Sequence, residues 1–201
     1  MPKVLIIDYG VGNLLSLECA LEKVGLDTEI GLSKQKLRNT DGIALPGVGN
    51  FSVAANKLGP YRQEMLECVR NGVPILGICL GMQLFFKESE EGGGEGLSLF
   101  EGKNIRLPNT VKVPHMGWNT LRIVKDTEIL EDVDEGAFMY FVHSLHPIPE
   151  DEGIVCAKTD YGTIFTSAIT NKNVYGTQFH PEKSGDIGLK ILKNFAKTVS
   201  R

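Results

Sequence analysis

Residues 73–88 read Val-Pro-Ile-Leu-Gly-Ile-Cys-Leu-Gly-Met-Gln-Leu-Phe-Phe-Lys-Glu, and this stretch decides the fold. The apolar run Ile75–Ile78 has the length of a buried strand. Residues 80–88 lack proline and carry apolar side chains at helical spacing, which predicts a helix. The sequence therefore predicts a buried strand that turns abruptly into a helix, with Cys79 at the turn.

Cys79 lies between Gly77 and Gly81, in a Gly-x-nucleophile-x-Gly arrangement at the predicted strand-to-helix turn. A turn this sharp leaves no room for side chains beside the nucleophile, which explains the two glycines. The start of a helix offers unpaired N–H groups and the positive end of a dipole, and both favour a thiolate. The alternative is a core cysteine between two packing glycines, and this stretch alone leaves both interpretations open.

The composition is typical of one globular domain that spans residues 1–201, with 42% apolar and 23% charged residues. A net charge of −4 without a basic run argues against nucleic acid as a partner. No apolar stretch approaches the roughly 20 residues that cross a membrane. The first residues lack the layout of a signal peptide, so we expect a cytoplasmic protein.

Four cysteines occur at spacings that match no zinc pattern, and a chain of this size needs no disulfides. We therefore expect no metal and no cofactor. The three cysteines other than Cys79 fit ordinary core positions; they are Cys19, Cys68 and Cys156.

Strands alternate with helices along the first half of the chain, which predicts parallel pairing in an open α/β sheet. The expected strands are 3–8, 27–30, 42–45, 75–78 and 174–179, and the expected helices are 14–24, 51–58, 61–70, 80–88 and 186–199. Antiparallel strands at the edge or back of the sheet are expected at 104–107, 120–124, 137–142, 154–158 and 163–169. The prediction is a three-layer, mostly parallel sheet flanked by helices, with antiparallel edge strands.

Ligands of open α/β sheets bind beyond the carboxyl ends of the strands. Cys79 lies at such an end, as do loops 9–13 and 47–50 and His180 after the last strand. His180 could take the thiol proton, and Glu182 could fix the far ring nitrogen. A lone histidine after a strand is more often a surface residue, but the elbow and the sheet topology together favour the catalytic interpretation.

Three blocks of sequence resemble the class I, triad-type glutamine amidotransferases: residues 46–49, 77–83 and 178–182. Four further blocks look like the glutaminase subunits of imidazole glycerol phosphate synthases: residues 8–14, 96–97, 114–119 and 140–144. The blocks span nearly the whole chain in the order of that family. The resemblance implies that Cys79 attacks the side-chain amide of glutamine, releases ammonia and forms a glutamyl thioester, which water hydrolyses with His180 as the base.

The tetrahedral oxyanion of such a reaction needs preorganised donors, and the N–H of Leu80 at the helix start is one candidate. The resemblance implies that the N–H of Val48 is the second, in a loop where Gly47 and Gly49 would let the peptide rotate. A plain tight turn after Pro46 is the alternative for this loop.

By resemblance, Gln83 and Ser144 would lie beside the substrate. A solvent-facing helix position is the alternative for Gln83. The family has an aromatic residue after Ser144, whereas this chain has Leu145, so only main-chain contacts are implied there.

Ammonia made for synthesis needs a sealed path to its acceptor, and nothing in these 201 residues reads as a synthase domain. The resemblance implies a heterodimer with a (β/α)₈-barrel cyclase subunit in histidine biosynthesis. Its interface would include Asn13, Met116, Trp118 and Lys183, with Trp118 as an exposed anchor on a glycine-rich loop. Core packing is the alternative for Trp118.

Three other functions remain open at this stage. A paralogous glutaminase could supply ammonia for the amidation of surface sugars. A cysteine peptidase or another hydrolase could share the sheet topology, and a binding subunit could carry a vestigial site.

His115, in a loop block, is expected to serve the interface or the structure, and His146 is expected to lie in a loop. Neither His115 nor His143 is expected to be a base.

Overall fold

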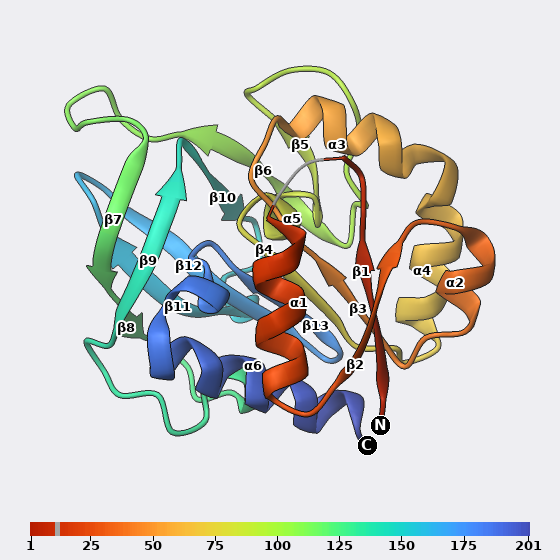
Figure 1. Ribbon diagram of the computed structural model, residues 1–201. Helices are drawn as coiled ribbons and strands as arrows, with labels where there is room; N and C mark the ends of the chain where they lie inside the picture. Colours follow the sequence, from red (N-terminus) through yellow and green to blue (C-terminus); the bar gives the residue numbers. More distant parts are fainter. Residues whose placement is uncertain (11–12) are drawn as a thin grey trace.

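The computed structural model describes residues 1–10 and 13–201, and an eight-stranded sheet forms its centre (Figure 1). Neighbouring strands follow the order β2-β1-β3-β4-β13-β12-β11-β8. The strands from β2 to β13 are parallel, and the pairings from β13 onward to β8 are antiparallel. Their bounds are β1 (Lys3–Ile7), β2 (Asp27–Gly31), β3 (Gly42–Leu45), β4 (Ile75–Ile78), β8 (Arg122–Ile123), β11 (Val155–Asp160), β12 (Ile164–Asn171) and β13 (Val174–Thr177).

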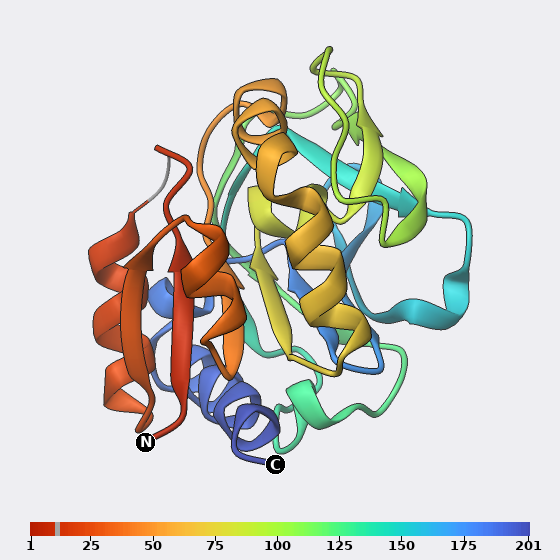
Figure 2. The ribbon, with the colours of Figure 1, turned by 90° about the vertical axis from the view of Figure 1, so that its right-hand side faces the viewer.

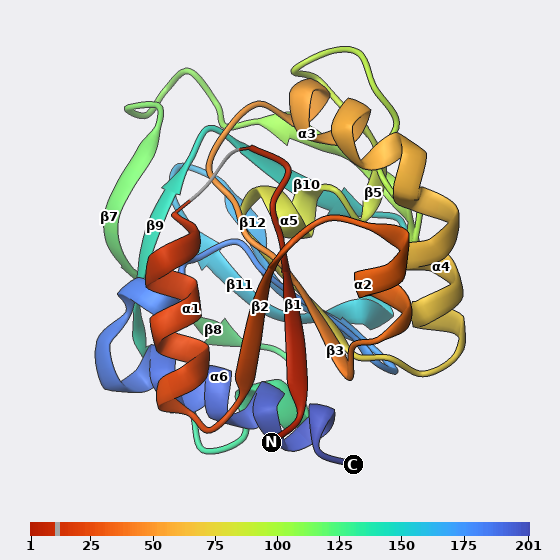
Figure 3. The same ribbon diagram turned by 45° about the vertical axis from the view of Figure 1, so that its right-hand side comes forward.

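Helices cover both faces of this sheet, which confirms the predicted three layers (Figures 2 and 3). Alternate side chains of a strand point to opposite faces. In β1, Val4 and Ile6 join one core, while Leu5 and Ile7 join the other. The first core lies under α1 (Leu14–Lys23) and α6 (Gly185–Val199), and the second under α2 (Lys34–Arg38), α3 (Phe51–Leu58) and α4 (Arg62–Arg70).

Two smaller sheets stand beside the central one. One has the order β10-β6-β5, and the other is an antiparallel ribbon of β7 and β9. The prediction that 104–107 and 137–142 belong to the edge or back of the central sheet is therefore wrong. The bounds are β5 (Phe86–Ser89), β6 (Phe100–Arg106), β7 (His115–Thr120), β9 (Phe138–His143) and β10 (Leu145–Pro149).

The predicted helix 80–88 is also wrong, because α5 spans only Leu80–Gln83 and a strand follows it. The carbonyl of Leu84 accepts a hydrogen bond from the N–H of Leu97 at 2.7 Å, and Phe86 pairs with Phe100. Pairing with a distant segment thus replaces the helical hydrogen bonds that the local pattern favours. The expected strand 120–124 is likewise divided, since β7 ends at Thr120 and β8 begins two residues later.

Helix α2, strand β5 and strand β10 have no counterpart among the predicted elements. The loop predicted at 9–13 includes residues 11 and 12, which lie outside the described residues. Within the described part of the chain, no helix is both long enough and apolar enough to span a membrane.

Candidate active site

Cys79 occupies a strained turn between β4 and α5, with φ 52° and ψ −104°. A non-glycine residue with such a positive φ costs about 1–3 kcal/mol and is common at active sites. A Cβ atom added at Gly81 would lie 2.0 Å from the carbonyl oxygen of Leu45, and one at Gly77 would lie 2.6 Å from the backbone of Gly81. The structure confirms that the turn leaves no room for side chains on either side of Cys79.

His180 and Glu182 form a buried pair at the end of the neighbouring strand. Thr177 at the end of β13 is in register with Ile78 at the end of β4, so Cys79 and His180 emerge at the same edge of the sheet. The short 3₁₀ helix η4 (Pro181–Lys183) turns Glu182 back, and its Oε1 lies 2.8 Å from Nδ1 of His180. The carboxylate therefore holds one ring nitrogen and leaves Nε2 for the sulfur.

The charge of His180 depends on both of its neighbours. Burial alone would lower its pKa, but the interactions with Cys79 and then Glu182 outweigh burial and raise the pKa to about 10. The imidazole is therefore protonated at neutral pH. Its Nε2 is buried and makes no hydrogen bond of good geometry among the described residues, although it lies close enough to the Cys79 sulfur for the two groups to interact. Such contacts commonly tighten only when substrate binds.

A cavity of about 220 Å³ opens beside Cys79. Of the predicted oxyanion and substrate residues, five line it: Val48, Gly49, Leu80, Gln83 and Ser144. Gln83 is buried rather than solvent-facing, and its Nε2 donates to the carbonyl oxygen of Leu145 at 2.9 Å. The structure thus brings the candidate nucleophile and the predicted substrate residues into one site.

The expected oxyanion donors are not both available in this arrangement. The N–H of Leu80 donates to the carbonyl oxygen of Gly47 at 3.4 Å. Because the C=O and N–H of a trans peptide point in opposite directions, the N–H of Val48 points away from Leu80. The preceding carbonyl, of Pro46, accepts a hydrogen bond from the buried Tyr9 hydroxyl. A rotation of the Gly47–Val48 peptide would release one donor and bring in the other.

The residues predicted to form the partner interface border the site. Met116 and Trp118 are more than half exposed, although they lie on strand β7 and not on a loop. Trp118 packs edge-on against Tyr140 with ring centroids 5.9 Å apart, and the carbonyl of Tyr140 accepts a hydrogen bond from the N–H of His180 at 2.9 Å. The exposed tryptophan is therefore two contacts from the main chain of His180.

The other two interface candidates lie on α1 and η4, which contact each other. Asn13 caps the N-terminus of α1, where its side chain accepts a hydrogen bond from the N–H of Ser16. Lys183 lies in η4 directly after Glu182.

Two buried histidines near the cavity are unsuited to act as bases. His143 Nδ1 lies 2.9 Å from the carbonyl oxygen of Leu145, and His115 Nδ1 lies 2.9 Å from Nε2 of His143. Burial lowers the pKa of His143 to about 3 and that of His115 to about 4, so both rings are neutral. The structure places His115 in β7, which corrects the predicted loop.

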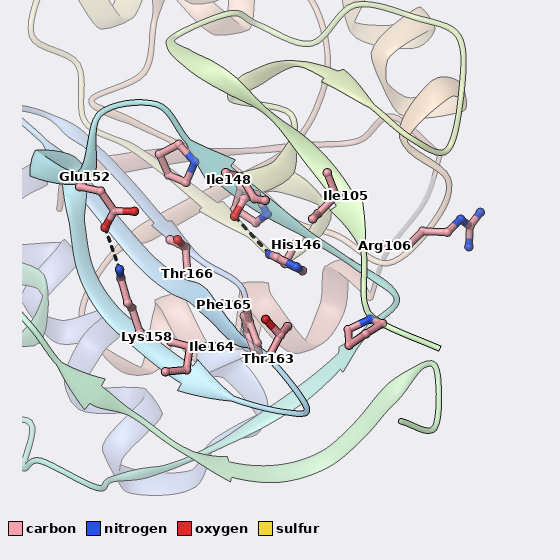
Figure 4. A pocket seen from close by; sticks show the side chains of 13 residues that line it. Ile105, Arg106, His146, Ile148, Glu152, Lys158, Thr163, Ile164, Phe165 and Thr166 are labelled. Carbon is pink, nitrogen blue, oxygen red and sulfur yellow. Dashed lines mark hydrogen bonds and ion pairs between the residues drawn. The ribbon is translucent and has the colours of Figure 1, made fainter. Parts of the chain in front are cut away.

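His146 is also buried and lies in β10, which corrects the loop predicted there. It lines a second cavity of about 310 Å³, together with Phe165 and the ion-paired Lys158 and Glu152 (Figure 4). Cys79 and His180 do not line this cavity, so it is separate from the candidate active site.

Sequence reasoning assigned no role to Gln178, although it lies in the block that contains His180. Its side chain is fully buried, and its Nε2 lies 3.5 Å from the sulfur of Cys79. The sulfur also lies 3.5 Å from the carbonyl oxygen of Val142. The one sequence signal for Gln178 is its position, directly after β13 and two residues before His180.

Comparison with known proteins places this geometry in a family. Residues 5–199 match the family described as glutamine amidotransferase class-I. The chain belongs to the class-I glutamine amidotransferases. In this family context, Cys79, His180 and Glu182 are the candidate catalytic triad.

Relatives of similar length share nearly half of the sequence of this amidotransferase. The imidazole glycerol phosphate synthase subunit HisH of Archaeoglobus fulgidus is 48% identical over 200 residues, with 98% of this chain and 100% of the relative covered. The protein of the same name from Methanothermobacter thermautotrophicus is 47% identical, with 98% of each chain covered. Among solved structures, PurLQS from Thermotoga maritima matches with a TM-score of 0.78 at 21% identity over 98% of each chain, which supports the fold alone.

Proposed function

We propose that this chain is the glutaminase subunit of an imidazole glycerol phosphate synthase and that it hydrolyses glutamine to glutamate and ammonia. The observation that carries the proposal is the His180–Glu182 pair, buried beside Cys79 at the carboxyl ends of adjacent strands. Similarity to subunits of that name along nearly their whole length supports the choice of pathway. The domain proposed to do this is the whole chain, residues 1–201.

The proposed reaction has two steps. The Cys79 thiolate attacks the side-chain amide carbon of glutamine, and protonated His180 gives its proton to the departing nitrogen as ammonia leaves. Neutral His180 then takes a proton from water, which attacks the thioester and releases glutamate. Glu182 accepts a hydrogen bond from Nδ1–H of His180, so Nε2 is the nitrogen that donates the proton in the first step and accepts it in the second. No cofactor is needed.

The ammonia is proposed to pass to a (β/α)₈-barrel cyclase subunit in a cytoplasmic heterodimer. Exposed Met116 and Trp118 offer apolar area to such a partner, and Asn13 and Lys183 would complete the interface. The contact of Trp118 with Tyr140, which is hydrogen-bonded to His180, supports communication between this interface and the triad. The coupling proposed for Lys183 is tested by Lys183→Ala, which should change subunit affinity or ligand-stimulated glutaminase rate.

The alternative functions receive less support. The subunit name of the relatives favours histidine biosynthesis over the amidation of surface sugars. The small cavity beside Cys79, lined by Val48, Gly49 and Leu145 among others, suits one amino acid better than an extended peptide. A vestigial binding subunit would not need the His180–Glu182 pair, and Cys79→Ala would then leave its behaviour unchanged.

The deciding assay measures conversion of glutamine to glutamate by the purified chain, alone and with the cyclase subunit and its nucleotide ligand. We expect slow turnover alone, because Leu80 N–H is occupied, and a large increase in the complex. Absence of turnover in every combination, or equal turnover by Cys79→Ala, would overturn the proposal. Stimulation by a sugar-amidating partner but not by the cyclase would support the alternative pathway.

A further inference from the structure

The main-chain carbonyl of Leu145 fixes the orientation of the side chains around it. Its oxygen lies 2.9 Å from Nδ1 of His143 and 2.9 Å from Nε2 of Gln83. A carbonyl oxygen only accepts hydrogen bonds, so both nitrogens must carry hydrogen. The tautomer of His143 and the amide orientation of Gln83 are therefore determined by one atom.

The orientation of the Gln83 amide in turn determines the orientation of the Gln178 amide. Gln83 Nε2 uses its second hydrogen to donate to Oε1 of Gln178 at 3.1 Å. The amide oxygen of Gln178 is thereby held toward Gln83, and its Nε2 must face the sulfur of Cys79, 3.5 Å away. Because Gln178 is completely buried, water does not compete for this contact.

The sulfur therefore sits between a donor and an acceptor. The carbonyl oxygen of Val142, 3.5 Å away, can only accept, so it favours the protonated thiol. The amide of Gln178 can only donate in this orientation, so it favours the thiolate. Without Gln178, the remaining hydrogen-bond partner of the sulfur among the described residues would be the Val142 carbonyl, which opposes ionisation.

We propose that Gln178 is a positioning residue that directs the Cys79 sulfur away from the Val142 carbonyl and favours its thiolate form. Gln83 and the Leu145 carbonyl hold the amide of Gln178 in the donating orientation. The inference deepens the proposed function, because it assumes that Cys79 is the nucleophile of that reaction.

The test measures the reactivity of Cys79 toward iodoacetamide as a function of pH. Cys19 is exposed, whereas Cys68, Cys79 and Cys156 are all buried, so alkylation is measured by mass spectrometry on the peptide that carries Cys79, in a Cys19→Ser background. The main variant is Gln178→Met, which keeps the length of the side chain and removes the donor. Gln63→Met, at an exposed glutamine on α4, is the matched control, and Gln178→Asn serves if the methionine variant does not fold.

We expect Gln178→Met to move the midpoint of the alkylation profile up by about one pH unit, and Gln63→Met to leave it unchanged. In the complex, kcat should fall about tenfold with little change in KM, the effect of losing one hydrogen bond to a charged group. A lower kcat with an unmoved alkylation midpoint would show a merely structural role and overturn the proposal. Alkylation needs no glutamine, so its pH profile reports the effect of Gln178 on the Cys79 sulfur even if the chain lacks the proposed glutaminase activity.

Discussion

The main-chain N–H of Leu80 donates a 3.4 Å hydrogen bond to the carbonyl oxygen of Gly47. This contact occupies one of the two N–H groups proposed to hold the oxyanion, and it leaves the other, the N–H of Val48, turned away from Leu80. The triad pair is in place while the oxyanion site is not. Under the proposed function this is a resting arrangement, in which the Gly47–Val48 peptide would rotate before efficient turnover.

The first prediction concerns the peptide between Gly47 and Val48. Val48→Pro removes the N–H that the rotation would bring in, so we expect partner-stimulated glutaminase activity to fall by about 100-fold. Val48→Ala keeps the N–H and should retain nearly full activity, since the side chain is partly exposed. Steady-state rates of both variants in the complex make the comparison, and full activity of the proline variant would rule out Val48 as a donor.

The second prediction tests the strain at Cys79. Both Cys79→Gly and Cys79→Ala remove the sulfur, but only glycine adopts φ 52° without a steric cost. We expect the glycine variant to be about 1 kcal/mol more stable than the alanine variant, the reverse of their usual order. Urea unfolding of the two variants measures the difference. Greater stability of the alanine variant would mean that the turn is unstrained.

The third prediction concerns pH and the His180–Glu182 pair. The folded-state pKa of His180 is about 10, above the value of about 6.5 for an unfolded histidine. Because the folded pKa is raised, the stabilisation is fully present below about pH 6.5 and is lost as the pH rises through about 10. We expect the unfolding free energy of the wild type to decline more steeply over this range than that of Glu182→Gln.

Glu182→Gln itself should cost about 3 kcal/mol at pH 6.5, since it breaks a buried ion pair. The exposed carboxylate of Glu150 offers a matched control, and Glu150→Gln should follow the wild-type curve. Parallel curves for the wild type and Glu182→Gln would show that His180 carries no raised pKa.

The fourth prediction concerns the packing of the turn. Alanine at position 81 would place its Cβ 2.0 Å from the Leu45 carbonyl oxygen. Overpacking of a core typically costs about 1–3 kcal/mol, and a clash with backbone lies at the upper end of that range. Gly81→Ala should therefore lower the free energy of unfolding by about 3 kcal/mol or more. Gly93 is exposed, its φ is not positive, and an added Cβ would meet only the Ser52 hydroxyl at 3.8 Å, so Gly93→Ala should be neutral or stabilising. Thermal unfolding separates the two, and equal behaviour would contradict the close approach.

The elements that position the triad could be predicted because their signals are local. The continuous apolar runs of β1, β3 and β4 predict buried parallel strands, and β4 with Cys79 predicts the turn. The signal for β13 is weaker, since it reads Val-Tyr-Gly-Thr, but its pairing with β4 places His180 at the same edge of the sheet as Cys79. Because the strands are parallel, their carboxyl ends meet at one edge of the sheet, and this can be predicted without knowing any side-chain contact.

The errors arise where distant pairing decides the structure. Leu84 and Phe85 continue a helical pattern, yet their carbonyls bind the N–H groups of Leu97 and Leu99. His146 has no local strand signal but lies in β10 through its pairing with Ile105. The role inferred for Gln178 depends on hydrogen bonds from residues far away in sequence, so no local pattern could have indicated it.

The most direct test of the central claim is to trap the acyl-enzyme. The purified complex is mixed with isotopically labelled glutamine and quenched in acid, and the digested peptides are examined by mass spectrometry. We predict a glutamyl group on the sulfur of Cys79 that survives in acid and is released at alkaline pH, and no labelled group in the Cys79→Ser variant. Rapid glutamate production with no label on Cys79, or with label on another residue, would contradict it.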